Sequence, residues 1–431
     1  MAKLDRRKFI KITGWVTSAG LARILAPGLL VGSAAACQAQ PPAQPPTSTA
    51  GSQSIDPTAT VSGPATALPP TNTAVVQPSP TAGSAPKADF GPRVVHVRAG
   101  AATKWSGQER YWEHVDPQVV GDMVDRGLQA LTGQSTSADA WRRILSNYQP
   151  GQGIVIKLNF NNTLAGNCSA VSGQINALPQ PANAVVAGLK SIGVDEQDIW
   201  FYDGVNRYIP EYFAAGIRYG NVQFFDKCHQ PVTYDSRDAD AIVSFSPPQG
   251  IPTPASEKIA DVLVRARYLI NMPILKNHDC AGISLGFKNH FGTVDNPGGM
   301  HGHVFLVSAC GGGFYSNYSP LVDLNQNAHI RQKTVLTIGD GLCGARGSQE
   351  AWPSAWSTFG GSLPNSLFFS TDPVALDCVM ADHLRAEPGA GVMAGADEYL
   401  KFAQDAGMGV YERGDPWGGG YQRIDYQKIV Y

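Results

Sequence analysis

The sequence predicts an α/β domain with a mainly parallel sheet flanked by helices and a glycine-rich irregular insertion. From residue 89 onward, short apolar runs alternate with helical segments, which is the pattern of strand–helix–strand units. The run 153–160 is rich in β-branched residues and 199–203 in aromatic ones, and both kinds favour strands. The chain has 431 residues, of which 43% are hydrophobic, so it is long enough to bury a large core.

The expected elements follow one another along the chain. Strands are predicted at 89–98, 153–160, 199–203, 222–225, 241–246, 268–270, 334–338 and 367–370. Helices are predicted at 116–131, 137–148, 181–192, 209–218, 256–264, 321–328, 372–385 and 396–404. Asp116 and Asp372 are each followed by proline, so each is expected to cap a helix with proline in its first turn. The segment 297–314 is glycine-rich and is expected to be irregular.

Residues 1–36 have the features of an export signal. The stretch Asp5-Arg6-Arg7-Lys8-Phe9-Ile10-Lys11 matches the twin-arginine pattern. The apolar region that follows is interrupted by Arg23 and several glycines, so it is too weak for a stable membrane span. We therefore expect export by the twin-arginine route to the outer face of the cytoplasmic membrane.

A cysteine at the end of this signal provides a candidate lipid anchor. Ser33-Ala34-Ala35-Ala36-Cys37 resembles a bacterial lipoprotein cleavage site, after which Cys37 would be lipidated. Simple cleavage near Ala36 is the alternative. Residues 37–88 are rich in Pro, Thr and Ser and almost uncharged, which predicts a disordered tether. The α/β domain is expected at 89–431, with membrane contact only through the N-terminal anchor.

The charge balance of the domain argues against nucleic acid as a partner. Residues 1–88 hold seven of the 33 basic residues and two of the 35 acidic ones, so the remainder has a net charge of about −7. Such a domain lacks the broad basic surface that nucleic acid and anionic lipid require. A site lined by lysines would then be a local exception.

Six cysteines lie beyond Cys37. They are Cys168, Cys228, Cys280, Cys310, Cys343 and Cys378. No two are spaced as C-x-x-C, and this scattered arrangement disfavours an iron–sulfur cluster. An even number outside the cytoplasm permits disulfides, although spacing alone does not pair them. Cys280 and Cys343 are also considered as ligands, the alternative being that they are small buried apolar residues.

Polar side chains follow several predicted strands at the point where each strand ends. These residues are Lys157, Asn159, Asp203, Lys276, His278 and Asp340. The carboxyl ends of parallel strands meet at one edge of a sheet, where ligands bind in such folds. We therefore expect these groups to converge. The alternative is that the strands simply end in polar turns.

Lysine and histidine side chains at this edge suit an anion. Three residues are assigned to catalysis, His278, Lys276 and Asp340. Four are assigned to substrate binding, Lys157, Asn159, Lys288 and Asn289. Ammonium groups hold phosphate, carboxylate or sulfonate by charge and hydrogen bonds, so the expected partner is a small anionic ligand or substrate. A lysine desolvated beside another cation also serves as a nucleophile or base, and this alternative stays open.

A divalent metal is a secondary hypothesis, and no other cofactor is indicated. Its expected ligands are His278, His301, His303 and Asp340. Neutral imidazoles and carboxylates are frequent ligands for zinc and similar ions. The spacing matches no compact metal motif, and the alternative for His301 and His303 is solvent exposure.

Five motifs together resemble a known family. They are Ile156–Asn159 (I-K-L-N), Pro273–His278 (P-I-L-K-N-H), Gly286–Gly292 (G-F-K-N-H-F-G), Gly339–Gly341 (G-D-G) and Asp372–Asp377 (D-P-V-A-L-D). In this order they resemble the domain-of-unknown-function 362 family over about residues 94–386. The resemblance implies that its shared polar residues here are Lys157, Lys276, His278, Lys288, Asn289, Asp340 and Asp377. Some relatives carry a ferredoxin-type module, whose cysteines this chain lacks, and that difference argues against electron transfer.

Two functions are consistent with these patterns. The first is an extracytoplasmic enzyme that acts on a small anionic substrate, with metal assistance as a further expectation. The second is a membrane-tethered protein that binds an anionic ligand without converting it. The sequence contains no G-x-S-x-G, P-loop or dinucleotide motif. It therefore does not support a hydrolase of the G-x-S-x-G type or a nucleotide-binding enzyme.

Overall fold

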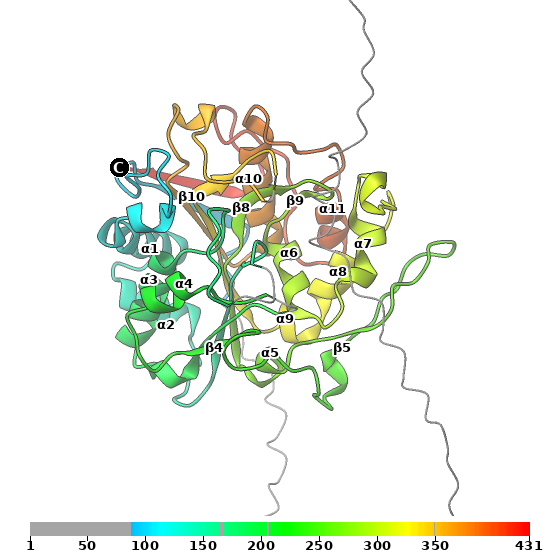
Figure 1. Ribbon diagram of the computed structural model, residues 1–431, viewed down its shortest axis with the longest axis horizontal. Coiled ribbons are helices and arrows are strands. Elements are labelled where there is room, and N and C mark those ends of the chain that lie inside the picture. Colours follow the sequence, from blue (N-terminus) through cyan, green and yellow to red (C-terminus); the bar gives the residue numbers. More distant parts are fainter. Residues whose placement is uncertain (1–87, 164–167, 205–206, 349) are drawn as a thin grey trace, which may run out of the picture. The chain divides into compact units, whose positions relative to one another are not determined.

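The computed structural model describes residues 88–163, 168–204, 207–348 and 350–431 (Figure 1). The predicted signal segment, Cys37 and the predicted tether up to residue 87 lie outside the described residues. Within the described part of the chain, no helix combines the length and apolar character needed to cross a membrane.

A mixed sheet forms the centre of the domain. Its strand order is β12 (Asp425–Val430), β1 (Arg93–Arg98), β11 (Ser366–Ser370), β10 (Thr334–Ala345), β7 (Tyr268–Asn271), β2 (Ile154–Lys157), β3 (Ile199–Tyr202) and β4 (Gln223–Phe225). In this order only β11 runs antiparallel to its neighbours, β1 and β10. Two further strands, β8 (Ile274–His278) and β9 (Gly282–Ile283), extend the sheet beside β10. The predicted α/β fold with a mainly parallel sheet is confirmed.

Helices cover both faces of the sheet, and each face has its own hydrophobic core (Figure 1). One face carries α1 (Pro117–Thr132), α2 (Ser137–Ile144), α3 (Pro179–Ser191) and α4 (Glu211–Gly216). The other carries α5 (Asp261–Arg265), α6 (Gly286–Asn289), α7 (Gly298–Val304), α8 (Pro320–Gln326), α9 (Ala328–Arg331), α10 (Pro373–Ala386) and α11 (Tyr399–Asp405). Short 3-10 helices are η2 (Tyr111–His114), η3 (Glu196–Asp198), η4 (Ala239–Ala241), η5 (His290–Thr293), η6 (Ser308–Cys310) and η7 (Ser357–Phe359). This two-layer covering explains why β2 and β7 are buried along their whole length.

Both predicted helix caps are present. The Asp116 carboxylate accepts the N–H groups of Gln118 and Val119 at the start of α1. Asp372 accepts the N–H groups of the second and third residues of α10 in the same way. These bonds satisfy backbone donors that have no partner inside a helix. The two helices therefore begin where the sequence predicted.

The structure corrects several predicted elements. The helix expected at 256–264 is only α5, and it is preceded by β6 (Glu257–Lys258), which pairs with β5 (Ile242–Val243). The segment 297–314 is not wholly irregular, since it contains α7 and η6. The strand expected at 334–338 continues to Ala345 as β10. It continues because β11 and β8 supply hydrogen-bonding partners on both sides, which outweighs the low strand preference of its glycines.

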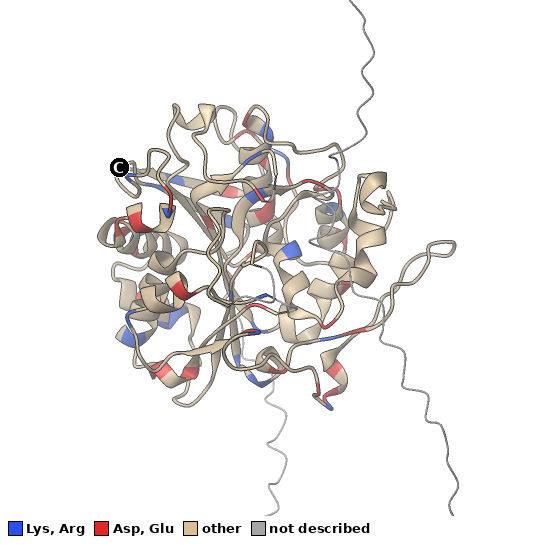
Figure 2. Cartoon of the chain, viewed as in Figure 1, with Lys and Arg blue, Asp and Glu red and all other residues tan. Residues whose placement is uncertain are grey.

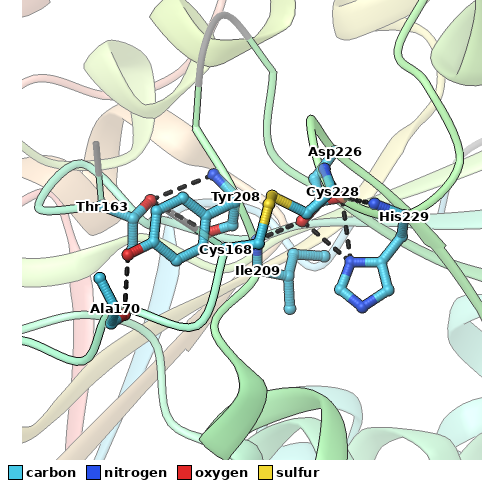
Figure 3. Close-up of a disulfide and its surroundings, with 8 residues drawn as sticks. All are labelled: Thr163, Cys168, Ala170, Tyr208, Ile209, Asp226, Cys228 and His229. Atoms are coloured by element: carbon cyan, nitrogen blue, oxygen red, sulfur yellow. Dashed lines mark hydrogen bonds and ion pairs between the residues drawn. A yellow bond between two sulfur atoms is a disulfide. The ribbon is translucent and has the colours of Figure 1, made fainter. Parts of the chain in front are cut away.

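Two disulfides join loops near the carboxyl ends of the strands. Cys280 is bonded to Cys310, and Cys168 is bonded to Cys228 in the turn after β4 (Figure 3). Next to the Cys168–Cys228 disulfide, the Asp226 carboxylate accepts the N–H of Cys228 at 2.9 Å. The turn after β4 is therefore held by a disulfide and by a hydrogen bond. Cys343 and Cys378 are buried thiols. The proposal that Cys280 is a ligand is therefore wrong, because its sulfur is in a disulfide.

Candidate functional site

Helix α6 is held in place by a buried carboxylate from α10. Asp377 accepts the N–H of Gly286 at 2.8 Å and that of Phe287 at 2.9 Å. Burial raises the pKa of Asp377 to about 7, and the two N–H groups act in the opposite direction. The D-P-V-A-L-D motif thus anchors the G-F-K-N-H-F-G motif. The anchored helix carries Lys288 and Asn289 to the strand ends.

Three asparagine side chains form a hydrogen-bonded chain, here called the amide chain. Asn159 donates to Asn289 at 3.0 Å, and Asn289 donates to Asn271 at 2.7 Å. At the other end, the Lys276 ammonium donates to the Asn159 amide oxygen at 2.8 Å. An ammonium has only donors, so it must face the oxygen of Asn159, and this sets the direction of the whole chain. The amide chain joins β7, the segment after β2, and α6 to the end of Lys276.

Lys157 is fully paired. Its ammonium contacts Asp203 at 2.7 Å and donates to the Leu158 carbonyl at 2.6 Å. Asp203 also accepts the Phe160 N–H at 2.7 Å. Burial lowers the pKa of Lys157, and the Asp203 charge opposes that shift. Lys157 therefore belongs to a closed ion pair at the base of the site, and its role there is to position neighbouring groups.

Two glycines let the chain approach this ion pair closely. A Cβ atom at Gly292 would overlap the Asp203 carboxylate and would lie 2.8 Å from the Lys157 ammonium. A Cβ atom at Gly204 would overlap the carbonyl of Gly292. The final glycine of the G-F-K-N-H-F-G motif is therefore required by a close backbone approach.

Lys276 is a buried cation that has no carboxylate partner among the described residues. Its side chain is 0% exposed, and among the described residues its only hydrogen bond goes to the neutral amide of Asn159. Burial, followed by the charge of Lys288, lowers the pKa of Lys276 to about 7. Arg207 and Lys157 lower it further, and Asp203 raises it. We call Lys157, Lys276, Lys288 and Arg207 the cation cluster.

The cation cluster is a local feature. Figure 2 shows basic and acidic positions interspersed over the domain. Within the cluster, one carboxylate, Asp203, acts on both Lys157 and Lys276. Asp203 is paired with Lys157 at 2.7 Å, whereas the Lys276 ammonium is bonded to a neutral amide, and this arrangement around Lys276 suits an anion.

His278 is oriented as a hydrogen-bond donor. Its Nδ1 atom accepts the backbone N–H groups of Cys280 at 3.1 Å and Ala281 at 3.2 Å. Burial, with the charges of Lys288 and Lys276, lowers its pKa well below the usual value. A neutral imidazole that accepts at Nδ1 carries its proton on Nε2. The free ring nitrogen is therefore an N–H donor.

An aromatic wall brings a second histidine to the site. The Lys288 ammonium lies 4.4 Å from the centre of the Phe291 ring, within the range of a cation–π contact. The His301 ring, from α7, stacks on Phe305 with centroids 4.4 Å apart. His278 lies against the same Phe305 ring at 5.5 Å. Burial and the charge of Lys288 lower the pKa of His301 to about 3, so both imidazoles are neutral.

The other two predicted metal ligands lie elsewhere. His303 is hydrogen-bonded through Nε2 to the Pro252 carbonyl at 2.6 Å. Asp340 accepts the Leu342 N–H at 3.0 Å, and its charge acts on Tyr212 and Cys343. Burial raises the pKa of Asp340 to about 7. Among the described residues no three His, Cys, Asp or Glu side chains are arranged to hold a metal ion.

The structure thus brings together most of the predicted site, and it adds residues that the sequence did not assign. Lys157, Asn159, Lys276, His278, Lys288, Asn289 and His301 are joined by hydrogen bonds, ring contacts or mutual effects on pKa. Asp203 was expected at this edge, and Asn271 could have been found by the same signal, because it directly follows the strand predicted at 268–270. Arg207 lies in a loop, where no sequence pattern pointed to it.

Comparisons with known proteins identify one family. A family model described as "Domain of unknown function (DUF362)" matches residues 154–382, a range that includes every residue of the site above. No curated protein matches the chain. One similar solved structure is described as the lactate racemase apoprotein from Thermoanaerobacterium thermosaccharolyticum, with 12% identity and a TM-score of 0.30. The match covers 57% of this chain and 55% of that one, so it spans about half of that protein's length.

Proposed function

This chain belongs to the DUF362 family, and from that premise we propose that it is an enzyme acting on a small anionic substrate beside Lys276. The observation that carries the proposal is the buried Lys276 ammonium, whose only hydrogen-bond acceptor among the described residues is a neutral amide. Burying a cation without a counter-charge is costly. An anionic substrate would supply the missing charge.

The neighbouring groups suit distinct tasks in such an enzyme. The lowered pKa of Lys276, about 7, leaves a large fraction of the amine unprotonated at neutral pH, as a base or nucleophile requires. Lys288 adds charge, and the Nε2–H of His278 donates to the bound anion. Asn159 orients the Lys276 amine through its amide oxygen. Asp340, predicted to be catalytic, has its own backbone partner and is not assigned a step here.

A binding protein that does not convert its ligand is the second candidate. The observation that favours it is that both imidazoles at the site have lowered pKa values, so they are uncharged at neutral pH and the positive charge there comes from the lysines. One such lysine with a cationic neighbour is sufficient to hold an anion. Product formation separates the two candidates.

We further propose that the protein works outside the cytoplasmic membrane, anchored through a lipidated Cys37. The twin-arginine pattern at Arg6 and Arg7 supports export. The two disulfides support an oxidising compartment. Cell fractionation of the parent and of an Arg6→Lys, Arg7→Lys double variant tests export, and radiolabelled palmitate tests Cys37. Retention of the parent in the cytoplasm would contradict the proposed location.

Metal assistance stays a prediction. The histidines that remain near each other are His278 and His301. A histidine ligand normally donates from its other ring nitrogen, whereas Nδ1 of His278 accepts two backbone N–H groups. This orientation favours the donor role for His278 over the ligand role.

Titration calorimetry tests the proposed site, with phosphate, sulfate, acetate and malonate as probes. We expect at least one probe to bind, and Lys276→Met to weaken that binding at least tenfold. The matched control is Lys190→Met, because Lys190 is a partly exposed lysine of α3 that is paired with Glu196. Proton NMR of each mixture then detects conversion. If Lys276→Met leaves anion binding unchanged, the proposed site is wrong.

A further inference from the structure

A large cavity lies beside the start of α6 and the end of β7. Its volume is about 640 Å³, within the range of roughly 300–1,000 Å³ that is typical of small-molecule sites. It extends over the end of β7 and the first residues of β10 and is bordered by residues of α8, α9 and the start of α10. None of the lysines of the cation cluster, nor His278, is among its described lining residues. The cavity thus adjoins the site through Asn271, the last member of the amide chain, but is not lined by its lysines.

The inner wall of this cavity is polar but uncharged. Asn271, His290, Asn325 and Thr337 line it, and each is at most 5% exposed. Asn271 and Thr337 are register partners on β7 and β10, so their backbones are adjacent. Burial is the main reason that the pKa of His290 falls to about 3, so this imidazole is neutral over the physiological range. The wall thus offers an imidazole, two amides and a hydroxyl without a formal charge.

These groups retain hydrogen-bonding capacity that the protein does not use. Both N–H groups of the Asn325 amide are donated to backbone carbonyls, so its oxygen remains as an acceptor. His290 pairs through Nδ1 with Thr293 at 3.2 Å. Among the described residues, His290 Nε2 and the Thr337 hydroxyl have no hydrogen-bond partner. Unused capacity on buried groups is expected where a ligand or water completes the site.

Charged residues occur only toward the outside of the cavity. Asp89 and Arg331 are exposed, and the Arg331 guanidinium donates to the Gly407 carbonyl at 2.8 Å. The third charged lining residue, Asp372, accepts backbone N–H groups at the start of α10 and at Val410. Arg331 is the one lysine or arginine among the described lining residues, and it lies at the exposed edge of the cavity and not at the inner wall. The apolar side chains Ile330, Pro373 and Met408 complete the walls.

We propose that this cavity binds an uncharged small molecule rich in hydroxyl groups, a sugar or a polyol. Such a molecule supplies donors to the Asn325 oxygen and both donors and acceptors to His290, Asn271 and Thr337. Its apolar ring or chain atoms fit the walls formed by Ile330 and Met408. This ligand class differs from the anion proposed for the cation cluster. The inference is therefore independent of the function proposed above.

Saturation-transfer NMR and titration calorimetry test the cavity with four probes: glucose, galactose, N-acetylglucosamine and myo-inositol. At least one is expected to bind saturably to the folded domain. Thr337→Val keeps the side-chain shape and removes the hydroxyl, and should weaken that binding at least fivefold. His290→Phe places an apolar ring in the cavity and should abolish it.

The matched control is Lys190→Met, at a partly exposed lysine of α3 that is paired with Glu196, and this variant should leave sugar binding unchanged. If His290→Phe fails to fold, Thr337→Val alone decides, because it alters no hydrogen bond within the described protein. Absence of saturable binding for all four probes would mean that the cavity holds only water, and would overturn the inference. Binding that neither cavity variant weakens would overturn it as well.

Discussion

The Lys276 ammonium donates to the amide oxygen of Asn159 at 2.8 Å. A buried ammonium is usually paired with a carboxylate, but here its partner is a neutral amide. The nearby carboxylate, Asp203, is already paired with Lys157 at 2.7 Å. The site therefore keeps a buried cation whose charge is not balanced within the described residues. This imbalance underlies the first two predictions.

Removing the Lys276 charge should stabilise the protein while it destroys the site. We expect Lys276→Met to raise the free energy of unfolding at pH 7 by roughly 1–3 kcal/mol, because a buried cation is replaced by an apolar chain of similar length. The loss of the hydrogen bond to Asn159 offsets part of this gain. Urea unfolding of parent and variant measures the difference, and a variant less stable than the parent would contradict it.

The affinity for an anion should depend on pH through Lys276. Its pKa in the free protein is about 7, and a bound anion favours the protonated form. Below pH 7 the lysine is already protonated, so affinity should be constant. Above pH 7 binding requires proton uptake, and affinity should fall by up to tenfold per pH unit. Calorimetry in two buffers of different ionisation enthalpy measures the uptake, and equal heats at pH 8 would argue against it.

The same lysine affects stability with the opposite sign. Its pKa is about 7 in the folded protein, and an unperturbed lysine has a pKa of 10.5. Between pH 7 and 10.5 the unfolded chain therefore binds more protons than the folded protein. Stability from this group should therefore rise as pH increases from 7 to 10.5. The slope should be smaller in Lys276→Met. Parallel urea titrations at pH 7, 8 and 9 compare the two slopes.

Two carboxylates that cap helices should differ in their effect on binding. Asp377→Ala removes the acceptor of two N–H groups on α6, and should lower both stability, by about 2 kcal/mol, and anion affinity. Asp372→Ala removes the cap of α10, and should lower stability by about 1 kcal/mol without changing that affinity. Thermal unfolding and calorimetry on both variants provide the comparison. If both variants lose the same anion affinity, Asp377 does not act by positioning α6.

Gly292 and Gly121 form a matched pair of glycine substitutions. Gly292→Ala should break the Lys157–Asp203 ion pair, because its Cβ would overlap the Asp203 carboxylate, and should cost about 3 kcal/mol or more. Gly121→Ala lies within α1, where nothing is within 4 Å of the new atom, and should stabilise by up to about 1 kcal/mol. Urea unfolding of both variants checks the two signs.

Metal content tests the orientation of His278. Because Nδ1 accepts two backbone N–H groups, we expect that His278→Ala will not change the divalent metal content of protein purified without chelator. Elemental analysis by mass spectrometry measures this content. A stoichiometric metal that is lost in His278→Ala, with the variant still folded by circular dichroism, would restore the ligand role.

Much of the fold was readable from local patterns. The caps at Asp116 and Asp372 and the apolar strands β2, β3 and β7 follow from periodicity and turn chemistry, which act over a few residues. Strand β8 was not predicted, since the strand expected before it ended at residue 270 and charged side chains such as Lys276 are rare in buried strands. It pairs with β10, which comes much later in the chain, so no short stretch of sequence can predict this pairing.

For the site, the sequence sufficed to place Lys157, Lys276 and His278 at one sheet edge, since their positions at strand ends are local properties. Tertiary structure alone decided which of these charges are neutralised. Lys157 meets Asp203 while Lys276 meets Asn159, and His278 turns Nδ1 toward the backbone, because contacts between distant segments choose the partners. The same contacts separated Asp340 and His303 from the predicted metal set, since the direction of a side chain depends on how its strand or helix packs.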